Sequence, residues 1–237
     1  MLNNMGNKKV LVSLTVIRDG WKKRLAEINE NQIEEIALFP TVLDVTARKE
    51  LYKALDESCV KSIPHVHLRH DMELGELEYF VEKYGTEAFN IHPTASLALV
   101  NDLSKYSSMI YVENAGKVLE ETDLQGFAGI CLDFSHWDDY FMKQGQGYDE
   151  SKDKIARLAK NFKIGCGHVS AMKTTIHPDV GIPGRMHYDE HVFENLSEFD
   201  YMKRYKQYMP EYISIELENS IKDQLRAKEY LEKIINN

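Results

Sequence analysis

The feature that most constrains the fold of this chain is a regular alternation of short, apolar, β-branched runs with stretches whose apolar residues recur at helical spacing. Eight runs have the character of strands, at 10–16, 36–39, 62–68, 88–92, 108–112, 128–132, 163–169 and 213–217. Helical spacing is found between them, at 21–28, 46–55, 74–81, 96–103, 151–159, 197–209 and 221–235. This alternation implies parallel strands joined by right-handed crossovers. Eight units of about 30 residues are enough to close a (β/α)8 barrel, so we predict a single α/β barrel domain over residues 1–237.

An open, doubly wound sheet is the alternative architecture. It normally has a Gly-x-Gly-x-x-Gly turn after its first strand, whereas this chain has Thr-Val-Ile-Arg-Asp-Gly at 15–20.

Two residues mark helix ends: Thr46 is placed to cap the second helix, and Gly85 to end the third. Segment 170–195 is too long for an ordinary connection between strand and helix. We therefore predict a long, functional loop after the seventh strand.

Composition narrows the classes of function. The net charge of −9 and the pI of about 5.5 argue against a nucleic-acid partner, although a local basic loop is compatible with them. The three cysteines form no Cys-x-x-Cys pair, so a disulfide framework is not expected. No apolar run reaches the ~18 residues of a membrane helix, and the N-terminus lacks the apolar segment of a signal peptide. These features predict a cytoplasmic protein without membrane association.

Acidic or imidazole side chains stand at the C-terminal ends of the last four predicted strands. In the expected registers the last inward-pointing residues are Glu113, Asp133, His168 and Glu216. Strand ends of a barrel meet at one mouth, so these side chains should converge. A strand-end glutamate alone is usually solvated, and a lone histidine is usually a core residue. Carboxylates gathered on four consecutive strands, however, would repel unless a cation neutralised them. We predict a site for Mn²⁺, Mg²⁺, Co²⁺ or Zn²⁺, and the imidazole favours zinc or manganese.

Other residues are candidates for a second layer around this centre. The additional candidate ligands are His65, His92, His136, Asp189 and His191. Since His65 and His67 lie on the same face of the strand, the alternation of side chains does not decide which of the two is the ligand. His136, Lys173 and Arg185 are the candidates for orienting substrate hydroxyls or an anionic group.

Seven short motifs in a fixed order point to a known family. They are Ile-Pro-His at 63–65, Asn-Ile-His-Pro at 90–93, Val-Glu-Asn at 112–114, Leu-Asp-Phe-Ser-His at 132–136, Gly-His-Val at 167–169, Asp-Glu-His at 189–191 and Ile-Glu at 215–216. In this order the chain, from about its third strand onward, resembles the xylose-isomerase-like TIM-barrel superfamily, which groups sugar isomerases and epimerases with DNA-repair enzymes of the endonuclease IV type.

The resemblance implies a ligand set for each branch of the superfamily. In the isomerase and epimerase branch it implies one metal held by Glu113, Asp133, His168 and Glu216. In the endonuclease branch it implies three zinc ions, with the further ligands His65, His92, His136, Asp189 and His191.

The chain departs from the superfamily pattern in two places. The endonuclease branch opens its first strand with His-Val-Ser followed by glycines, and residues 12–20 contain nothing similar. This difference weighs against DNA binding. Most members have Gly-Glu-Gly after the Asp-x-His motif, where this chain has Glu-Asn-Leu-Ser-Glu at 194–198. The geometry of that segment is therefore left open.

Three hypotheses of function follow. The first is isomerisation or epimerisation of a sugar, sugar phosphate or polyol, in which Glu113 and Glu216 move protons at a carbon beside a metal-bound carbonyl. The second is phosphodiester hydrolysis by a multinuclear centre, for which the surplus of ligands is the motive. The third is a barrel that binds a ligand without turnover. It ranks last because a buried charged cluster is costly without a metal. A homo-oligomer is compatible with each hypothesis.

Overall fold

The computed structural model describes residues 8–16, 20–94, 98–115, 118–147, 149–179 and 183–236. Its first strand is split at Val12 into β1 (Lys9–Leu11) and β2 (Ser13–Thr15). The half β1 pairs with the last strand of the sheet, β11 (Tyr212–Ile215), whereas β2 pairs with β3 (Glu35–Phe39). Because the two halves pair with opposite ends of the strand order, the sheet closes into a ring.

The remaining strands complete the ring in chain order. They are β4 (Ser62–His67), β5 (Ala88–Ile91), β6 (Ile110–Glu113), β7 (Gly129–Asp133) and β8 (Ile164–Val169). Every neighbouring pair in this sheet is parallel. With the split strand counted once, the described residues form the eight-stranded α/β barrel that the alternating sequence pattern predicts.

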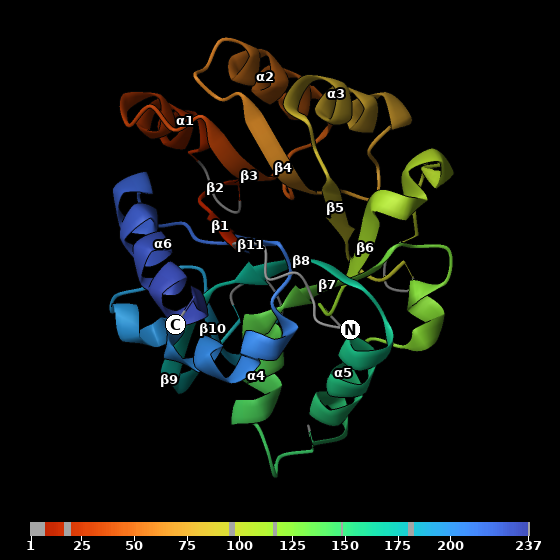
Figure 1. Ribbon diagram of the computed structural model, residues 1–237, viewed down its shortest axis with the longest axis vertical. Coiled ribbons are helices and arrows are strands. Elements are labelled where there is room, and N and C mark those ends of the chain that lie inside the picture. The colour runs from red at the N-terminus through yellow and green to blue at the C-terminus, as the bar shows by residue number, and fades with distance from the viewer. Residues whose placement is uncertain are drawn as a thin grey trace.

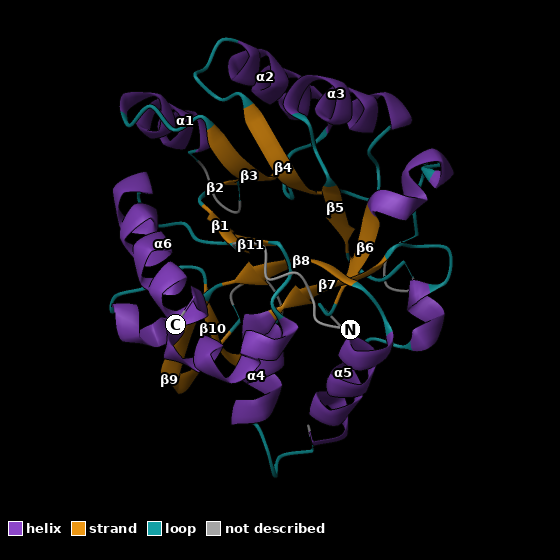
Figure 2. Cartoon of the chain, viewed as in Figure 1, coloured by secondary structure: helices purple, strands orange, loops and turns teal. Residues whose placement is uncertain are grey.

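Helices surround the strands, as Figures 1 and 2 show. The α-helices are α1 (Trp21–Glu30), α2 (Val45–Asp56), α3 (Leu74–Tyr84), α4 (Phe134–Met142), α5 (Asp149–Asn161) and α6 (Ile221–Asn236), and the 3₁₀ helices are η1 (Ser104–Met109), η2 (Glu121–Leu124) and η3 (Leu196–Tyr208). Among the helices of the described residues, none has the length and apolar character needed to span a membrane.

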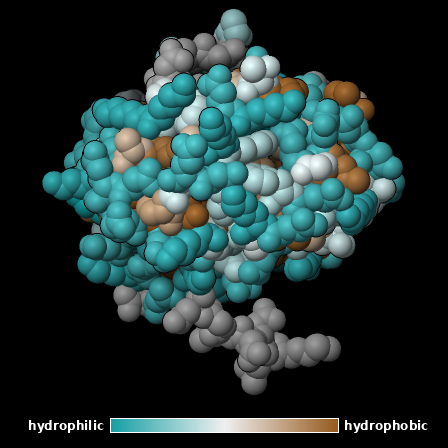
Figure 3. Space-filling view, turned by 90° about the horizontal axis from the view of Figure 1, so that it is seen from above, coloured by the Kyte–Doolittle hydropathy of each residue, from teal (hydrophilic) through white to brown (hydrophobic). Residues whose placement is uncertain are grey.

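Alternating strand residues separate two environments. Residues such as Val66 of β4 pack with Leu77 and Phe80 of α3 in an apolar core between the ring and the helices. Their strand neighbours His65 and His67 are also buried but point into the ring. The outer surface seen from above in Figure 3 is mainly hydrophilic, with hydrophobic residues scattered among polar ones.

The segment after β8 differs from the predicted loop. Residues 171–190 contain an antiparallel hairpin of β9 (Ala171–Pro178) and β10 (Met186–Glu190). The helix predicted over 197–209 is present as the 3₁₀ helix η3. The connection is therefore long because it carries a second, two-stranded sheet.

Other local predictions are corrected by the structure. Helix α4 was not predicted, and it begins directly after Asp133, whose side chain caps it by accepting a bond from the His136 N–H. The cap of α2 is Asp44 instead of Thr46. Of the helix predicted over 96–103, residues 96 and 97 lie outside the described residues and residues 98–103 are not helical. Gly85 does end α3 in the left-handed conformation, as predicted.

Candidate metal centre

Four predicted site residues meet at the C-terminal mouth of the ring. Glu113 and Asp133 are the last residues of β6 and β7, and Glu216 directly follows β11. His168 lies in β8, opposite Asp133 on one side and Ser214 of β11 on the other. All four side chains are buried or nearly so. Adjacent strands thus deliver three carboxylates and one imidazole to one place.

The distances within this group suit a shared cation better than hydrogen bonds. His168 Nδ1 lies 3.5 Å from Glu113 Oε2, 3.5 Å from Glu216 Oε2 and 3.9 Å from Asp133 Oδ2. Hydrogen bonds between nitrogen and oxygen are usually 2.7 to 3.2 Å long, but ligands about 2.1 Å from a tetrahedral metal ion lie about 3.4 Å apart. Asp133 Oδ2 and both ring nitrogens of His168 are buried without a hydrogen-bond partner. These residues therefore fit a divalent metal ion.

The charges of the group also favour a bound cation. Burial alone would lower the pKa of His168, but Glu113, Glu216 and Asp133 raise it to about 10. Burial alone would raise the pKa of Glu216, yet the nearby His168 and His191 lower it to about 2. The lowered pKa values of Glu113 and Glu216 keep both carboxylates ionised beside His168, where a metal ion would supply the balancing positive charge.

Amide side chains hold the carboxylates in place. The Asn90 amide donates to Glu113 Oε2 at 2.6 Å. Asn114 clamps the backbone of Asp133 by accepting from its N–H at 2.7 Å and donating to its carbonyl at 2.9 Å. Ser135 donates to Asp133 Oδ1 at 2.5 Å. Such partners fix the orientation of metal ligands, which raises the affinity of a site.

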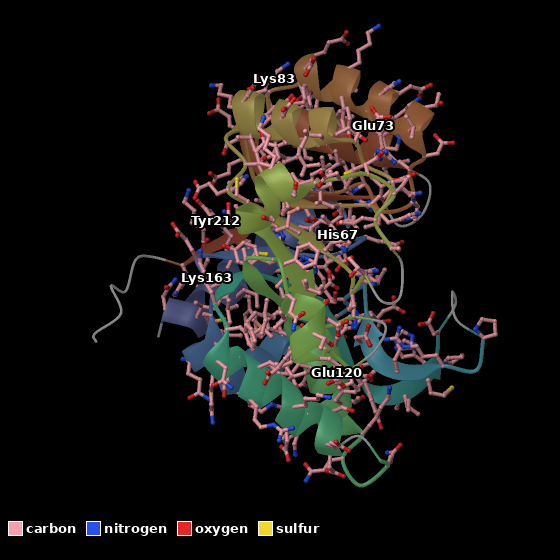
Figure 4. The ribbon with its side chains drawn as sticks, turned by 90° about the vertical axis from the view of Figure 1, so that its right-hand side faces the viewer. His67, Glu73, Lys83, Glu120, Lys163 and Tyr212 are labelled. Carbon is pink, nitrogen blue, oxygen red and sulfur yellow. The ribbon has the colours of Figure 1, made fainter. Side chains whose placement is uncertain are left out.

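A second group of donors shares Glu113. His67 Nε2 lies 3.1 Å from Glu113 Oε2 and 3.3 Å from Nε2 of the half-exposed His92, which in turn lies 3.9 Å from Glu113 Oε1. Figure 4 shows His67 in the interior of the barrel. His136 extends the set on the other side, with Nε2 3.6 Å from Asp133 Oδ2. Glu113, Asp133 and His136 also form a group whose donor atoms lie within 4.8 Å of one another.

The two histidines of β4 take different places. His65 is deeper in the barrel, where Nδ1 lies 2.7 Å from Ser214 Oγ and Nε2 lies 3.0 Å from Asn90 Oδ1. His67, one step closer to the mouth, is the one beside Glu113 and His92. His65 thus reaches Glu113 through Asn90, although it also lies within 4.8 Å of donor atoms of Cys131 and His168.

Asp189 and His191 have protein partners at the mouth. Asp189 Oδ1 lies 3.1 Å from Nδ1 of His187, and Nδ1 of His191 lies 3.0 Å from the Glu216 carbonyl. Burial would raise the pKa of Asp189, but His187 and His136 lower it, so its carboxylate is ionised next to both histidines.

The two basic residues predicted to orient the substrate, Lys173 and Arg185, lie in different places. Lys173 is 2.9 Å from Glu198 of η3, away from the four carboxylate and imidazole groups. Arg185 pairs with Asp179 at 3.3 Å. Arg69, a basic residue that was not identified from the sequence, lines a pocket together with His67 and His92.

Comparison with known proteins finds similarity only among solved structures. No protein-family model and no curated protein matches the chain. A xylose isomerase-like TIM barrel protein from Mycobacterium smegmatis, in complex with magnesium, is 10% identical with a TM-score of 0.48, covering 96% of each chain. The 3-keto-D-glucoside 4-epimerase of E. coli is 9% identical with a TM-score of 0.43, covering 97% of this chain and all of that one. A xylose isomerase domain protein from Planctomyces limnophilus is 12% identical with a TM-score of 0.47, covering 96% of this chain and 94% of that one.

These likenesses concern the fold, and at such identities they carry no argument about activity. The similarity to xylose-isomerase-like TIM barrels that the motifs led us to expect is what the structural comparison finds over nearly the whole chain.

Proposed function

We propose that the protein is a divalent-metal-dependent isomerase or epimerase of a sugar, sugar phosphate or polyol. The observation that carries this proposal is the buried group of Glu113, Asp133, His168 and Glu216, in which Asp133 Oδ2 and both ring nitrogens of His168 have no hydrogen-bond partner and donor atoms of Asp133, His168 and Glu216 lie within 4.8 Å of one another. Zn²⁺ or Mn²⁺ suits a set of one imidazole and three carboxylates. When bound, such an ion supplies Lewis acidity toward a substrate carbonyl.

The two glutamates are the proton-transfer groups of this proposal. Glu113 and Glu216 reach the centre from β6 and from the end of β11, on different sides of His168. Burial would raise both pKa values, but the neighbouring histidines lower them, so both carboxylates are ionised at neutral pH. One glutamate accepts the proton from the carbon beside the carbonyl, and the other, once it has taken up a proton from solvent, delivers that proton to the neighbouring carbon or to the opposite face.

Hydrogen exchange with solvent tests the proton-transfer step. Wild-type protein loaded with Mn²⁺ or Zn²⁺ should incorporate deuterium from D₂O into a member of a panel of sugars and sugar phosphates. Glu113→Gln keeps an oxygen donor for the metal but cannot accept the proton, so exchange should cease while metal content stays the same. Glu87→Gln is the matched control, because Glu87 bonds Tyr212 at the opposite end of the barrel. Full exchange in Glu113→Gln would remove this mechanism.

A second candidate, phosphodiester hydrolysis, is favoured by one specific observation. Glu113 belongs both to the group with His67 and His92 and to the group with Asp133 and His136. Carboxylates shared between donor groups are what a multinuclear centre requires to generate hydroxide and bind phosphate. Against this, Asp189 and His191 already have protein partners at 3.1 and 3.0 Å.

Metal stoichiometry separates the two candidates. One equivalent of metal per chain with deuterium exchange supports the isomerase. About three equivalents, with hydrolysis of a phosphodiester or of abasic DNA, would support the hydrolase instead.

A further inference from the structure

A pocket of about 140 Å³ adjoins the candidate metal centre on the side of β4 and β5. His67 and His92 belong to both the pocket and the donor group around Glu113. The other polar side chains of its wall are Thr41, Arg69 and His70. Since a water molecule occupies about 30 Å³ in the liquid, the pocket has room for four or five waters, or for one group of similar size. A small molecule reacting at the metal centre can therefore extend a substituent into this pocket.

Arg69 is held in a fixed orientation at the pocket wall. Its Nε donates to Asp71 Oδ1 at 3.0 Å, and one terminal nitrogen donates to Asp71 Oδ2 at 3.2 Å. The other terminal nitrogen donates to the Thr41 carbonyl at 2.8 Å. These three bonds use three of the five N–H donors of a guanidinium, and two remain for a ligand.

A partly buried chain of ion pairs supports Arg69 from behind. Asp71 also accepts from Arg48 at 3.0 Å, and Arg48 makes a two-point contact with Glu76 at 2.8 and 2.9 Å. The Arg48 side chain is fully buried. Burying the Arg48 charge carries a large desolvation penalty, which only good geometry with its two acidic partners offsets. The chain fixes the Asp71 carboxylate, and Asp71 fixes the guanidinium plane of Arg69.

We propose that Arg69, with Thr41 and His70, forms an anion subsite that takes a terminal oxyanion of the substrate, either a phosphate or a carboxylate. This inference rests on the proposed function, because it places the reacting carbon of the same molecule at the metal centre. A guanidinium that keeps one free N–H on each terminal nitrogen can donate to two oxygens of such a group, whereas a sugar hydroxyl offers only one. The substrate is accordingly an anionic carbohydrate, and Arg69 takes the role that the sequence suggested for Lys173.

Binding of simple anions to the metal-loaded protein tests the subsite. The probes are inorganic phosphate and acetate, measured by calorimetry, and their two arms distinguish a phosphate subsite from a carboxylate subsite. Arg69→Gln should weaken binding of the preferred anion about tenfold or more, because it removes two charge-assisted hydrogen bonds. Arg226→Gln is the control, since Arg226 is an exposed partner of Asp223 on α6. It should bind like the wild type.

A second variant covers the case in which Arg69→Gln does not fold. His70→Gln leaves the ion-pair chain intact and alters only the pocket wall, so it should weaken the same anion several-fold. The proposal is overturned if the wild type binds neither anion at millimolar concentration. It is also overturned if the folded variants, Arg69→Gln and His70→Gln or the latter alone, bind both anions as well as the wild type does.

The two proposals fail in distinguishable ways. If phosphate binding depends on Arg69 but no sugar or sugar phosphate exchanges deuterium, the subsite stands and the isomerase falls. If neutral and anionic sugars exchange equally well, and Arg69→Gln raises KM for neither, the isomerase stands and the subsite falls.

Discussion

His168 is the residue on which the carboxylates of this protein converge. Its Nδ1 lies 3.5 Å from a carboxylate oxygen of both Glu113 and Glu216, and its ring packs on Phe39 in an edge-to-face arrangement with ring centroids 4.8 Å apart. A buried imidazole among acids either carries a proton or shares a cation with them. The unpartnered ring nitrogens favour the shared cation in the working protein.

Removing this imidazole should remove the metal. We expect His168→Ala to bind Zn²⁺ at least about a hundredfold more weakly than the wild type, since even the loss of an outer partner of a ligand costs 10- to 100-fold. His177→Ala is the control, because His177 lies in β9 and stacks on His187, outside the group of four. Zinc affinity is measured by competition with a chelating dye. Equal affinity in His168→Ala and wild type would show that the metal is held elsewhere.

The choice between His65 and His67 shows what strand parity resolves and what it does not. Both side chains point into the barrel, as alternation predicts. Depth along the barrel axis separates them, and depth depends on how the neighbouring strands are staggered. Arg69 was missed because its orientation comes from Asp71 and the buried Arg48, contacts that join the segment after β4 to α2.

At the scale of elements, β7 and β8 meet so closely that one backbone position admits only glycine. Gly129 has a φ of 145°, and a Cβ there would lie 2.2 Å from the Lys163 carbonyl oxygen. The next residue, Ile130, bonds that same carbonyl at 2.8 Å, so it cannot move away without losing the bond. This contact begins the strand that ends in Asp133.

Gly129→Ala should therefore destabilise the protein by about 3 kcal/mol or more, from backbone strain and a steric clash together. Gly75→Ala provides a matched control. A Cβ at Gly75 of α3 meets nothing within 4 Å, so alanine should stabilise by about 0.5 to 1 kcal/mol. Urea unfolding measures both changes. Similar stability of the two variants would contradict the packing described for β7.

The contact between α2 and α3 predicts a pH dependence of stability. Burial would raise the pKa of Glu76, but bonds from Arg48 and Tyr52 hold it below the ordinary value of 4.5. The folded state thus binds this proton more weakly than the unfolded chain does. The stability that the pair contributes is complete above about pH 4.5 and is lost as the pH falls through the lower, folded-state pKa.

Glu76→Gln should cost about 3 kcal/mol of unfolding free energy at pH 7, because it leaves the buried Arg48 without its main partner. The difference between wild type and variant should shrink as the pH is lowered to 3. Glu50→Gln, which removes an exposed partner of Lys22, should change little at either pH. A difference for Glu76→Gln that is the same at both pH values would rule out the lowered pKa.

For the molecule as a whole, the order of the strands was predictable from the sequence, whereas the hairpin β9–β10 and helix α4, which are added to the barrel, were not predicted. Buried parallel strands give continuous apolar runs, so the eight strands could be found from the sequence, and their alternation with helices dictates closure. The hairpin β9–β10 was not found, because residues 174–176 are exposed and lack the apolar pattern of a buried strand. Helix α4 did leave a signal, since Phe134, Trp137 and Phe141 have helical spacing after the capping Asp133.

Convergence of the four strand-end residues at one mouth follows from closure, which is why the sequence could predict it. Which histidines and basic side chains surround them depends on the loops and on how neighbouring strands are shifted along the barrel axis. Both vary independently of the closure of the barrel. The central claim is therefore that Glu113, Asp133, His168 and Glu216 together hold a divalent cation.

The most direct test is a metal titration of chelator-treated protein, with the number of ions bound per chain and the midpoint of thermal unfolding measured on the same samples. We expect saturable binding of at least one Zn²⁺ or Mn²⁺ per chain and, at a hundredfold excess over Kd, a midpoint higher by about 5 to 11 °C. At the same metal concentration both effects should be much smaller in His168→Ala. A wild-type protein that binds neither ion saturably, and unfolds at the same temperature with and without them, would contradict the central claim.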